Sequence, residues 1–286
     1  MPEGDSLFRA AARMRPALEG RTLVRFEAPT LRGERPRPGE RIEGVEARGK
    51  HLLVHFAGGL SLRTHLRMTG SWHLYRSGKR WRRPRGQLRV AIDADNGWQA
   101  VCFAAPDVET YRRDAGEPRP VAALGPDLCR PEIDLDAVLA RLSAAPPSTE
   151  LAEALLDQRI AAGVGNVYKS EVCFACAVDP FTPLRDVDEA LRRRLWTVAH
   201  RLLRANLGGG PRVTHAGGVA VYGKPGRACP RCGVAIRVRR QGDQARQTFW
   251  CPGCQLPPKA PAGSADSPVP VANSGEEPEE SPLGFL

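Results

Sequence analysis

The sequence predicts an α+β protein: an N-terminal β-sandwich-like domain with a leading helix, a C-terminal helical domain, a β-hairpin held by four cysteines, and a disordered tail. Three observations support this class. Short apolar runs between turn residues dominate the first 115 residues, helical periodicity begins near residue 134, and two Cys-x-x-Cys pairs follow. The predicted boundaries are 1–115 for the β-rich domain, 116–133 for a linker, 134–222 for the helical domain, 223–256 for the cysteine hairpin and 257–286 for the tail.

The leading helix is predicted from the spacing of its apolar residues. Leu7, Ala11 and Met14 fall on one face of a helix, and Asp5 precedes them as a candidate N-cap. Pro16 has no backbone N–H to donate, so the helix is expected to end there.

Strands are predicted where apolar and β-branched residues cluster between glycine, proline and charged turns. They span residues 23–26, 51–56, 60–65, 88–92 and 98–103. Two intervening segments, 32–41 and 76–85, are strongly basic. A solvated loop is the simpler interpretation of each, but Trp81, among six basic residues, favours contact between the second segment and phosphate.

A proline-rich stretch separates the two halves of the chain. Residues 117–133 contain four prolines and are predicted to form a hinge. Helical spacing follows at residues 135–142, 150–160, 165–177 and 187–207. No apolar run approaches the roughly 20 residues that span a bilayer, so we expect a soluble, cytoplasmic protein.

Cys229 and Cys232 form one Cys-x-x-Cys turn, and Cys251 and Cys254 form another. Two such turns can direct four sulfurs at one tetrahedral Zn²⁺, and the 18 residues between them read as a hairpin. A pair of disulfides is the competing interpretation, but no hydrophobic segment would deliver the chain to an oxidising compartment. One structural zinc ion is therefore expected, because metal stabilises a hairpin with little core of its own.

The net charge of +10 understates the basic character of the folded part. Residues 255–286 carry one lysine and five acidic residues, which leaves about +14 on the first 254 residues. Such a surplus favours a polyanionic partner. No cationic amphipathic helix with an aromatic face is apparent, so nucleic acid is preferred over a membrane. The acidic, Pro- and Ser-rich tail is predicted to be disordered.

A glycine turn between two predicted helices forms a candidate anion site. Residues 163–165 read Gly-Val-Gly and precede Asn166, at the start of the second helix. Free N–H groups at a helix N-terminus and the Asn166 side chain can donate to a phosphate. From the turn alone, an ordinary helical hairpin is the simpler interpretation.

Together with both ends of the chain, this turn resembles the helix–two-turn–helix of the formamidopyrimidine-DNA glycosylase/endonuclease VIII family. The family's Gly-Val-Gly-Asn-x-Tyr-x-Ser-Glu is matched from Gly163 to Glu171, and the chain also opens with Met-Pro-Glu and closes with a four-cysteine finger. The resemblance covers nearly all of residues 1–255. It implies a bacterial, nucleoid-associated DNA glycosylase with AP-lyase activity that acts on damaged double-stranded DNA in base excision repair.

The resemblance implies that Pro2, freed of Met1, attacks the sugar C1′ and forms a Schiff base. An amine suits both steps, because it is a nucleophile that then becomes an electron sink. At pH 7 roughly one α-amino group in ten is neutral, against roughly one lysine in 2,500. Glu3 is expected to act as general acid and base on the sugar and the departing base, since a closing, partly dry pocket can raise the pKa of a carboxyl group.

Three further residues fall on functional positions of the family. Lys50 matches a hairpin lysine that approaches the lesion phosphate and assists β-elimination; an exposed strand lysine is the alternative. Arg246 matches the finger arginine, which grips the flanking phosphates bidentately and promotes δ-elimination. Glu171 matches a carboxylate near the site, or merely completes the polar face of its helix.

Base eversion leaves a gap in the stack that an inserted side chain fills. By resemblance, Met68 is the apolar tip of this wedge, with Arg67 and Thr69 beside it; a core methionine is the alternative. Purine-type members fill the gap from an Asp-Pro-Arg-Arg-Phe-Gly loop, but residues 103–111 resemble the endonuclease VIII branch. Oxidised pyrimidines are therefore the predicted substrates, with 8-oxoguanine and formamidopyrimidine lesions as the alternative.

A catalytically inactive zinc-finger DNA-binding protein is the alternative from a different class. The joint presence of Pro2, Glu3, Lys50 and Arg246 favours the enzyme. A monomer is expected, because all the required residues converge within one chain and duplex DNA could pass between its halves.

Overall fold

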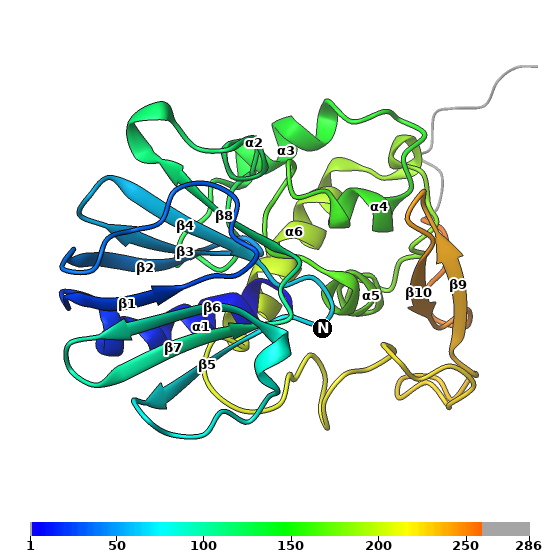
Figure 1. Cartoon of the computed structure of the whole chain (residues 1–286). Helices are drawn as coiled ribbons and strands as arrows, with labels where there is room; N and C mark the ends of the chain where they lie inside the picture. The colour runs from blue at the N-terminus through cyan, green and yellow to red at the C-terminus, as the bar shows by residue number, and fades with distance from the viewer. Residues whose placement is uncertain (1, 259–286) are drawn as a thin grey trace, which may run out of the picture.

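The structure is a computed structural model that describes residues 2–258. Met1 and residues 259–286, which make up nearly all of the predicted tail, lie outside the described residues. Figure 1 shows the β-rich domain at one end, the helices in the middle and the cysteine hairpin at the other end. Among the described residues, no helix combines the length and the apolar character needed to cross a bilayer.

Two antiparallel four-stranded sheets form the N-terminal domain and share one apolar core (Figure 1). The first sheet has the strand order β1 (Leu23–Glu27), β6 (Leu88–Ala94), β7 (Trp98–Phe103), β5 (Ser71–Arg76). The second has the order β2 (Ile42–Arg48), β3 (His51–Phe56), β4 (Leu60–His65), β8 (Asp107–Arg112). The predicted sandwich and its five predicted strands are confirmed.

The three strands that the sequence did not predict, β2, β5 and β8, all lie at sheet edges. Edge strands carry more polar and charged residues than central strands, because one side of the strand meets solvent. In β8, for example, only Val108 and Thr110 are buried, and the intervening positions are charged or aromatic. Such a segment lacks the apolar run on which a strand is recognised, and the neighbouring strand determines its conformation.

The leading helix α1 spans Gly4–Leu18 and packs its apolar face into the core of the sandwich. Two details of its prediction are wrong. Pro16 lies within the last turn, where its missing N–H removes only one late hydrogen bond and does not end the helix. Glu3 rather than Asp5 is the N-cap residue, and the Asp5 carboxylate is buried against the helical domain.

The helical domain contains four main helices around a core that includes Tyr168 and Trp196. These are α3 (Leu135–Ser143), α4 (Leu151–Leu156), α5 (Asn166–Ala175) and α6 (Glu189–Ala205). Elsewhere in the described residues there are four shorter helical turns: η1 (Arg85–Gln87), η2 (Arg113–Ala115), α2 (Arg119–Ala122) and η3 (Leu184–Asp186). Helix α4 ends earlier than predicted, because the Gln158 side chain donates to the carbonyl groups of Leu156 and Val164 (2.7 and 3.0 Å).

The predicted hinge is packed between the two halves. Leu128 and Cys129 belong to the core of the helical domain, and the Asp127 carboxylate accepts a hydrogen bond from the Gly49 N–H of the β2–β3 turn (2.8 Å). The connection therefore joins the domains through specific contacts. The boundaries of the domains stay a prediction.

The cysteine hairpin pairs β9 (Arg237–Gln241) with β10 (Arg246–Trp250), as predicted. Strand β10 packs on α5, which separates the hairpin from the sheets in Figure 1. Phe249 and Phe174 belong to one small apolar core at this contact, and the Phe249 N–H donates to Ser170 Oγ (3.3 Å).

Candidate active site

The first residues of the chain pack directly on the glycine turn of the helical domain. The Gly4 N–H donates to the Gly163 carbonyl (2.9 Å), and a Cβ on Gly4 would lie 2.8 Å from Gly163 Cα. A Cβ on Gly165 would collide with the Glu3 carboxyl group. The absence of a side chain at Gly4 and Gly165 therefore allows the N-terminus to reach the turn.

Glu3 is fully buried and caps the start of α5. Its two carboxylate oxygens accept hydrogen bonds from the N–H groups of Gly165, Val167 and Tyr168 (2.9, 2.7 and 3.3 Å). Burial raises the pKa of Glu3, whereas the charges of Arg212 and Lys50 and the α5 N–H groups act in the opposite direction. These N–H groups already have an acceptor, so the predicted phosphate site on the helix N-terminus is occupied by the chain's own carboxylate.

The Asp5 carboxylate, which is also buried, stabilises the contact between the N-terminus and the helical domain. It accepts two hydrogen bonds from the Arg212 guanidinium (2.6 and 2.9 Å) and one from the Tyr168 hydroxyl (3.1 Å). Sequence reasoning missed Arg212, because it lies in a glycine-rich segment after α6 without a recognisable motif. The Asp5–Arg212 ion pair connects the segment that follows α6 to the start of α1.

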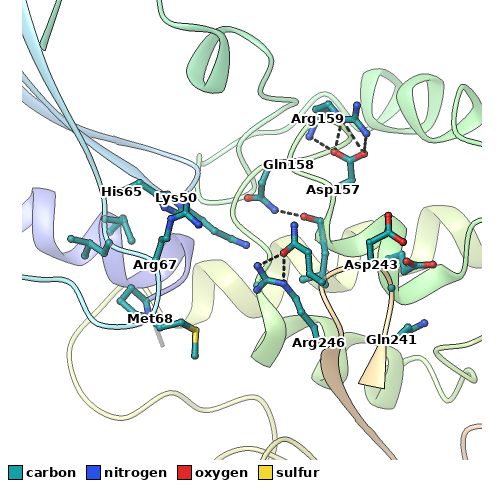
Figure 2. Close-up of a pocket in the computed structure, with 18 residues that line it drawn as sticks. Lys50, His65, Arg67, Met68, Asp157, Gln158, Arg159, Gln241, Asp243 and Arg246 are labelled. Atoms are coloured by element: carbon teal, nitrogen blue, oxygen red, sulfur yellow. Dashed lines mark hydrogen bonds and ion pairs between the residues drawn. The ribbon is translucent and has the colours of Figure 1, made fainter. Parts of the chain in front are cut away.

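A cavity of about 690 Å³ lies where the two domains meet. Its wall includes five of the predicted functional residues: Pro2, Lys50, Arg67, Met68 and Arg246. In Figure 2, Lys50, Arg67 and Met68 approach from the sheet side, and Arg246 approaches from the hairpin on the opposite side. The structure therefore brings residues from both domains to one cavity, with Glu3 directly behind Pro2.

Lys50 reaches the cavity from the β2–β3 turn. Gly49 adopts a positive φ of +56°, and a Cβ there would lie 2.9 Å from Ala162 Cβ, so the turn sits tightly on the helical domain. Burial lowers the pKa of Lys50 to about 8; Glu3 raises it and Arg246 lowers it further. Lys50 is half-buried in the cavity wall and close enough to Glu3 for the carboxylate charge to affect its pKa, so it is not the freely exposed strand lysine of the alternative.

Arg246 is the first residue of β10, and its guanidinium is held by its own turn. Nε and Nη2 both donate to Gln244 Oε1 (2.8 and 2.6 Å). The bond pair holds the guanidinium at the cavity wall and occupies its Nε–Nη2 edge, an edge that can otherwise bind a carboxylate or phosphate bidentately.

The predicted wedge is an exposed loop, closed by a hydrogen bond from the Gly70 N–H to the Leu66 carbonyl (2.8 Å). The Met68 side chain is 66% exposed, so the alternative of a core methionine is wrong. Arg67 pairs with Asp107 (2.9 Å), and the Thr69 hydroxyl donates to the Ala104 carbonyl (3.0 Å). These contacts fix the loop at its base and leave the Met68 tip free.

Besides Glu3, two predicted site residues outside the cysteine cluster do not line the cavity. Asn166 is largely buried and donates from Nδ2 to the Gln247 carbonyl of the hairpin (2.8 Å). The Glu171 carboxylate is buried and accepts hydrogen bonds from the backbone N–H groups of Ala220, Val221 and Tyr222 (2.7, 2.9 and 2.8 Å). The contacts of Glu171 correct its assignment to DNA: it anchors the loop that leads into the finger.

A histidine pair beside the cavity was also missed by sequence reasoning. The rings of His51 and His65 lie 4.9 Å apart, and Arg63 Nη1 contacts His51 Nδ1 at 3.0 Å. Burial lowers the pKa of His51 to about 3 and that of His65 to about 4, so both rings are neutral at pH 7. His65 also lines the 690 Å³ cavity.

The four predicted metal ligands form one cluster. The Sγ atoms of Cys229, Cys232, Cys251 and Cys254 all lie within 4.8 Å of one another, with Cys229 and Cys254 3.6 Å apart and Cys232 and Cys251 3.4 Å apart. Four thiolates around a tetrahedral ion at about 2.3 Å would be separated by about 3.8 Å. The cluster therefore has the size and donor set of a metal site.

The remaining thiols are buried in the apolar cores, as predicted for core cysteines: Cys102, Cys129, Cys173 and Cys176. Burial raises the pKa of each of these four thiols, which keeps them protonated.

This combination of a sandwich, a glycine turn that seats the N-terminus and a four-cysteine hairpin defines a class of DNA repair enzymes. Residues 1–109 match the formamidopyrimidine-DNA glycosylase N-terminal domain, and residues 124–215 match the formamidopyrimidine-DNA glycosylase H2TH domain. The chain is 43% identical to a probable endonuclease 8 2 of Streptomyces coelicolor, over 90% of this chain and 95% of that protein. The chain therefore belongs to the formamidopyrimidine-DNA glycosylase/endonuclease 8 family.

Further relatives agree with this assignment. A DNA-(apurinic or apyrimidinic site) lyase, Nei2, of Mycolicibacterium smegmatis is 37% identical over 89% of this chain and 99% of that protein. The crystal structure of MutM (Fpg) from Thermus thermophilus is 29% identical with a TM-score of 0.73, over 89% of this chain and 98% of that chain. The fold is shared with Lactococcus lactis Fpg bound to DNA containing an abasic site (22% identical, TM-score 0.73, 88% of this chain and 99% of that chain).

Proposed function

We propose that this chain is a bifunctional DNA glycosylase and AP lyase that removes damaged bases from double-stranded DNA through an N-terminal Schiff base. The observation that carries the proposal is the single cavity that joins Pro2 and Lys50 of the sandwich to Arg246 of the hairpin, with buried Glu3 behind Pro2. The lyase name of the mycobacterial relative supports the second activity.

The proposed chemistry begins with the Pro2 amine, which attacks C1′ while the base departs with a proton. Glu3 supplies and removes protons at the sugar, and its raised pKa places this exchange nearer to neutral pH. Cleavage of the C1′–O4′ bond, with a proton passed from Glu3 to O4′, opens the sugar ring and leaves an iminium at C1′. The iminium acidifies the C2′ hydrogen, and loss of that proton expels the 3′ phosphate by breaking the C3′–O bond. A second elimination then breaks the C5′–O bond. Lys50 and Arg246 provide positive charge for the two phosphates that leave.

We further propose oxidised pyrimidines as the preferred substrates. The β7–β8 connection has only three residues, 104–106, which leaves little length for the void-filling loop of the purine-type members. The wedge would then come from Arg67, Met68 and Thr69 alone, as in the endonuclease VIII branch. Relatives named endonuclease 8 support this branch, and purine lesions are the alternative that the substrate test below distinguishes.

Zn²⁺ is the proposed occupant of the four-cysteine cluster, with a structural role. Four thiolates leave no open coordination position, so the ion would hold the hairpin and take no part in the reaction. Metal analysis should give one zinc per chain, and the chain is expected to act as a monomer on sedimentation.

Sodium borohydride trapping tests the proposal. On duplexes with one oxidised pyrimidine, one 8-oxoguanine or one abasic site, the methionine-free protein should form a covalent adduct, fastest with the pyrimidine lesion among the two base lesions. Pro2→Gly should lower the adduct yield at least tenfold. The exposed Pro147→Gly, between α3 and α4 and outside the cavity, is the matched control and should leave the yield unchanged. Binding without any adduct on the three duplexes would favour the inactive DNA-binding alternative.

A further inference from the structure

Lys169 is a buried lysine on α5 that occupies one of the variable positions of the glycine-turn motif. Its side chain is among the largest fully buried side chains of the described residues, with 1% of the residue exposed. Nζ donates to Thr248 Oγ1 at 2.7 Å and to the Gln247 carbonyl at 3.2 Å. Both acceptors belong to β10, so this amine links the helical domain to the hairpin.

This placement is costly for a lysine. No carboxylate of residues 2–258 forms an ion pair with Lys169, and its two described partners are neutral oxygens. Burial lowers its pKa to about 8, which reflects the free energy of removing the charge from water. A straight apolar side chain would fill the same space without that cost. The contacts that Lys169 makes with β10 therefore explain its presence better than a contribution to folding stability does.

The bond to Thr248 is one link in a buried polar chain. The Thr248 hydroxyl, which accepts from Lys169, donates in turn to Gln241 Oε1 on β9 (2.6 Å). Gln241 Nε2 donates to Glu150 Oε2 and to the Pro180 carbonyl (2.6 and 3.2 Å). Both strands of the hairpin are thus fixed to the helical domain through directional hydrogen bonds, which the apolar contact of Phe249 alone would not provide.

The residues that Lys169 holds follow directly after Arg246 in the strand. Gln247 and Thr248 are its next two neighbours, so the position of their backbone sets where the Arg246 guanidinium enters the cavity. Arg246 also lies close enough for its charge to lower the pKa of Lys169. We propose that Lys169 is a positioning residue that holds Arg246 against the phosphate released in the second elimination. The inference rests on the role proposed above for Arg246.

The variants can be chosen so that the hairpin still folds. Lys169→Met keeps the length of the side chain, and it leaves the Gln247 carbonyl bonded to Asn166 and the Thr248 hydroxyl bonded to Gln241. Thr248→Val removes the Lys169 contact from the opposite side, together with the hydroxyl bond to Gln241. Arg201→Met, at an exposed arginine of α6 outside the cavity, is the control that removes a positive charge elsewhere.

The experiment compares two readouts on each variant. On duplex DNA with one abasic site, Lys169→Met should leave the borohydride adduct and the first-elimination product within twofold, but should lower the ratio of second to first product at least threefold. Hydrogen–deuterium exchange of the free protein should be faster at residues 246–250. Thr248→Val, which also loses the bond to Gln241, should give at least the same change, and the double variant should give no more than Thr248→Val alone. Arg201→Met should give the wild-type values.

Other outcomes would overturn the inference. An unchanged product ratio with unchanged exchange would mean that Lys169 does not hold the hairpin. A lower ratio without faster exchange would assign the effect to charge alone, and an equal loss of the adduct and of both products would assign it to general damage. If the wild-type protein formed no adduct, the proposed function would fail, whereas the exchange measurement would still decide whether Lys169 anchors β10.

Discussion

Glu3 has two roles that use the same carboxylate. Its oxygens satisfy three N–H groups at the start of α5, and the side chain lies beside the residue proposed as the nucleophile. The residue proposed as the acid of the reaction is therefore also a structural cap across the domain contact. Because all three donors point at a fully buried group, rotation of the carboxylate during the reaction would be opposed by the helix.

Replacement of Glu3 by Gln should consequently affect both stability and chemistry. The amide has one acceptor oxygen, and its NH₂ group would face a backbone N–H. We expect Glu3→Gln to lower the free energy of unfolding by about 1–3 kcal/mol and to abolish base excision. Urea unfolding and single-turnover excision measure the two effects, with the exposed Glu132→Gln as a control. Wild-type stability in Glu3→Gln would contradict the capping role.

The neutral histidine pair predicts a pH dependence of stability. The pKa of His51 is about 3 in the folded protein and about 6.5 in an unfolded chain. Between these values the unfolded state binds more protons, so stability is lost as the pH falls below about 6.5, by up to about 1.4 kcal/mol per pH unit. Above about pH 7 this contribution is constant.

His51→Gln retains an acceptor for Arg63 and cannot be protonated. Its loss of unfolding free energy between pH 7 and pH 5 should be smaller than that of the wild type by about 1–2 kcal/mol. Urea titrations of the two proteins at both pH values provide the measurement. An equal loss in both proteins would show that this ring does not contribute to acid sensitivity.

At the scale of elements, the sequence predicted the central strands, the longer helices and the hairpin, since each has a clear apolar pattern. It failed where tertiary contacts override that pattern. The edge strands β2, β5 and β8 were missed because they lack apolar runs. Helix α4 was predicted too long because the Gln158 side chain donates hydrogen bonds to backbone carbonyl groups at its end.

The candidate site likewise contains residues that sequence motifs identified and residues that only the fold brings together. Motifs located Pro2, Lys50 and Arg246, which the fold brings to one cavity. Asp5 and Arg212 were not predicted as a pair, because they are more than 200 residues apart and no spacing rule connects them. Glu171 was assigned to DNA because its motif position indicates proximity to the turn and does not indicate the direction of its side chain.

The Met68 loop is an element whose function can be separated from its stability. Because the side chain is 66% exposed, Met68→Ala should leave the free energy of unfolding within about 0.5 kcal/mol of wild type. Excision from duplex DNA should slow by about tenfold, since the inserted side chain offsets part of the few kcal/mol that eversion costs. Cleavage of a preformed abasic site in single-stranded DNA should be unaffected.

Single-turnover rates on both substrates test this expectation. Val24→Ala, an exposed apolar side chain on β1 outside the cavity, is the matched control and should match wild type on both. Equal slowing of Met68→Ala on duplex and single strand would exclude a role in filling the stack.

For the whole molecule, the distribution of charge indicates how DNA extends beyond the cavity. In the loop between β5 and β6, Trp81 is anchored by Gln99 and Phe103, so it holds the loop and is not free to stack on a base. Arg82 and Arg83 are exposed, and neither forms an ion pair within residues 2–258. The Gln87 carbonyl, at the end of this loop, accepts from Ala104, which contacts the wedge.

This proximity predicts that the loop contributes to phosphate binding. Arg82→Gln with Arg83→Gln should reduce the slope of log K against log [salt] by about 1–2. The paired control Arg201→Gln with Arg204→Gln, at exposed positions of α6 outside the cavity, should retain the wild-type slope. Fluorescence anisotropy across a salt series gives both slopes, and equal slopes in the two double variants would remove the loop from the interface.

The seating of the first residues on the glycine turn has a consequence for biosynthesis. The start of the chain emerges first from the ribosome, yet Gly4 and Glu3 find their partners only after residue 163 and the following helix have been made. Until then, Glu3 and Gly4 lack the backbone groups that they contact in the folded protein. The contact between the first residues and the glycine turn can therefore form only after more than half of the chain has been synthesised.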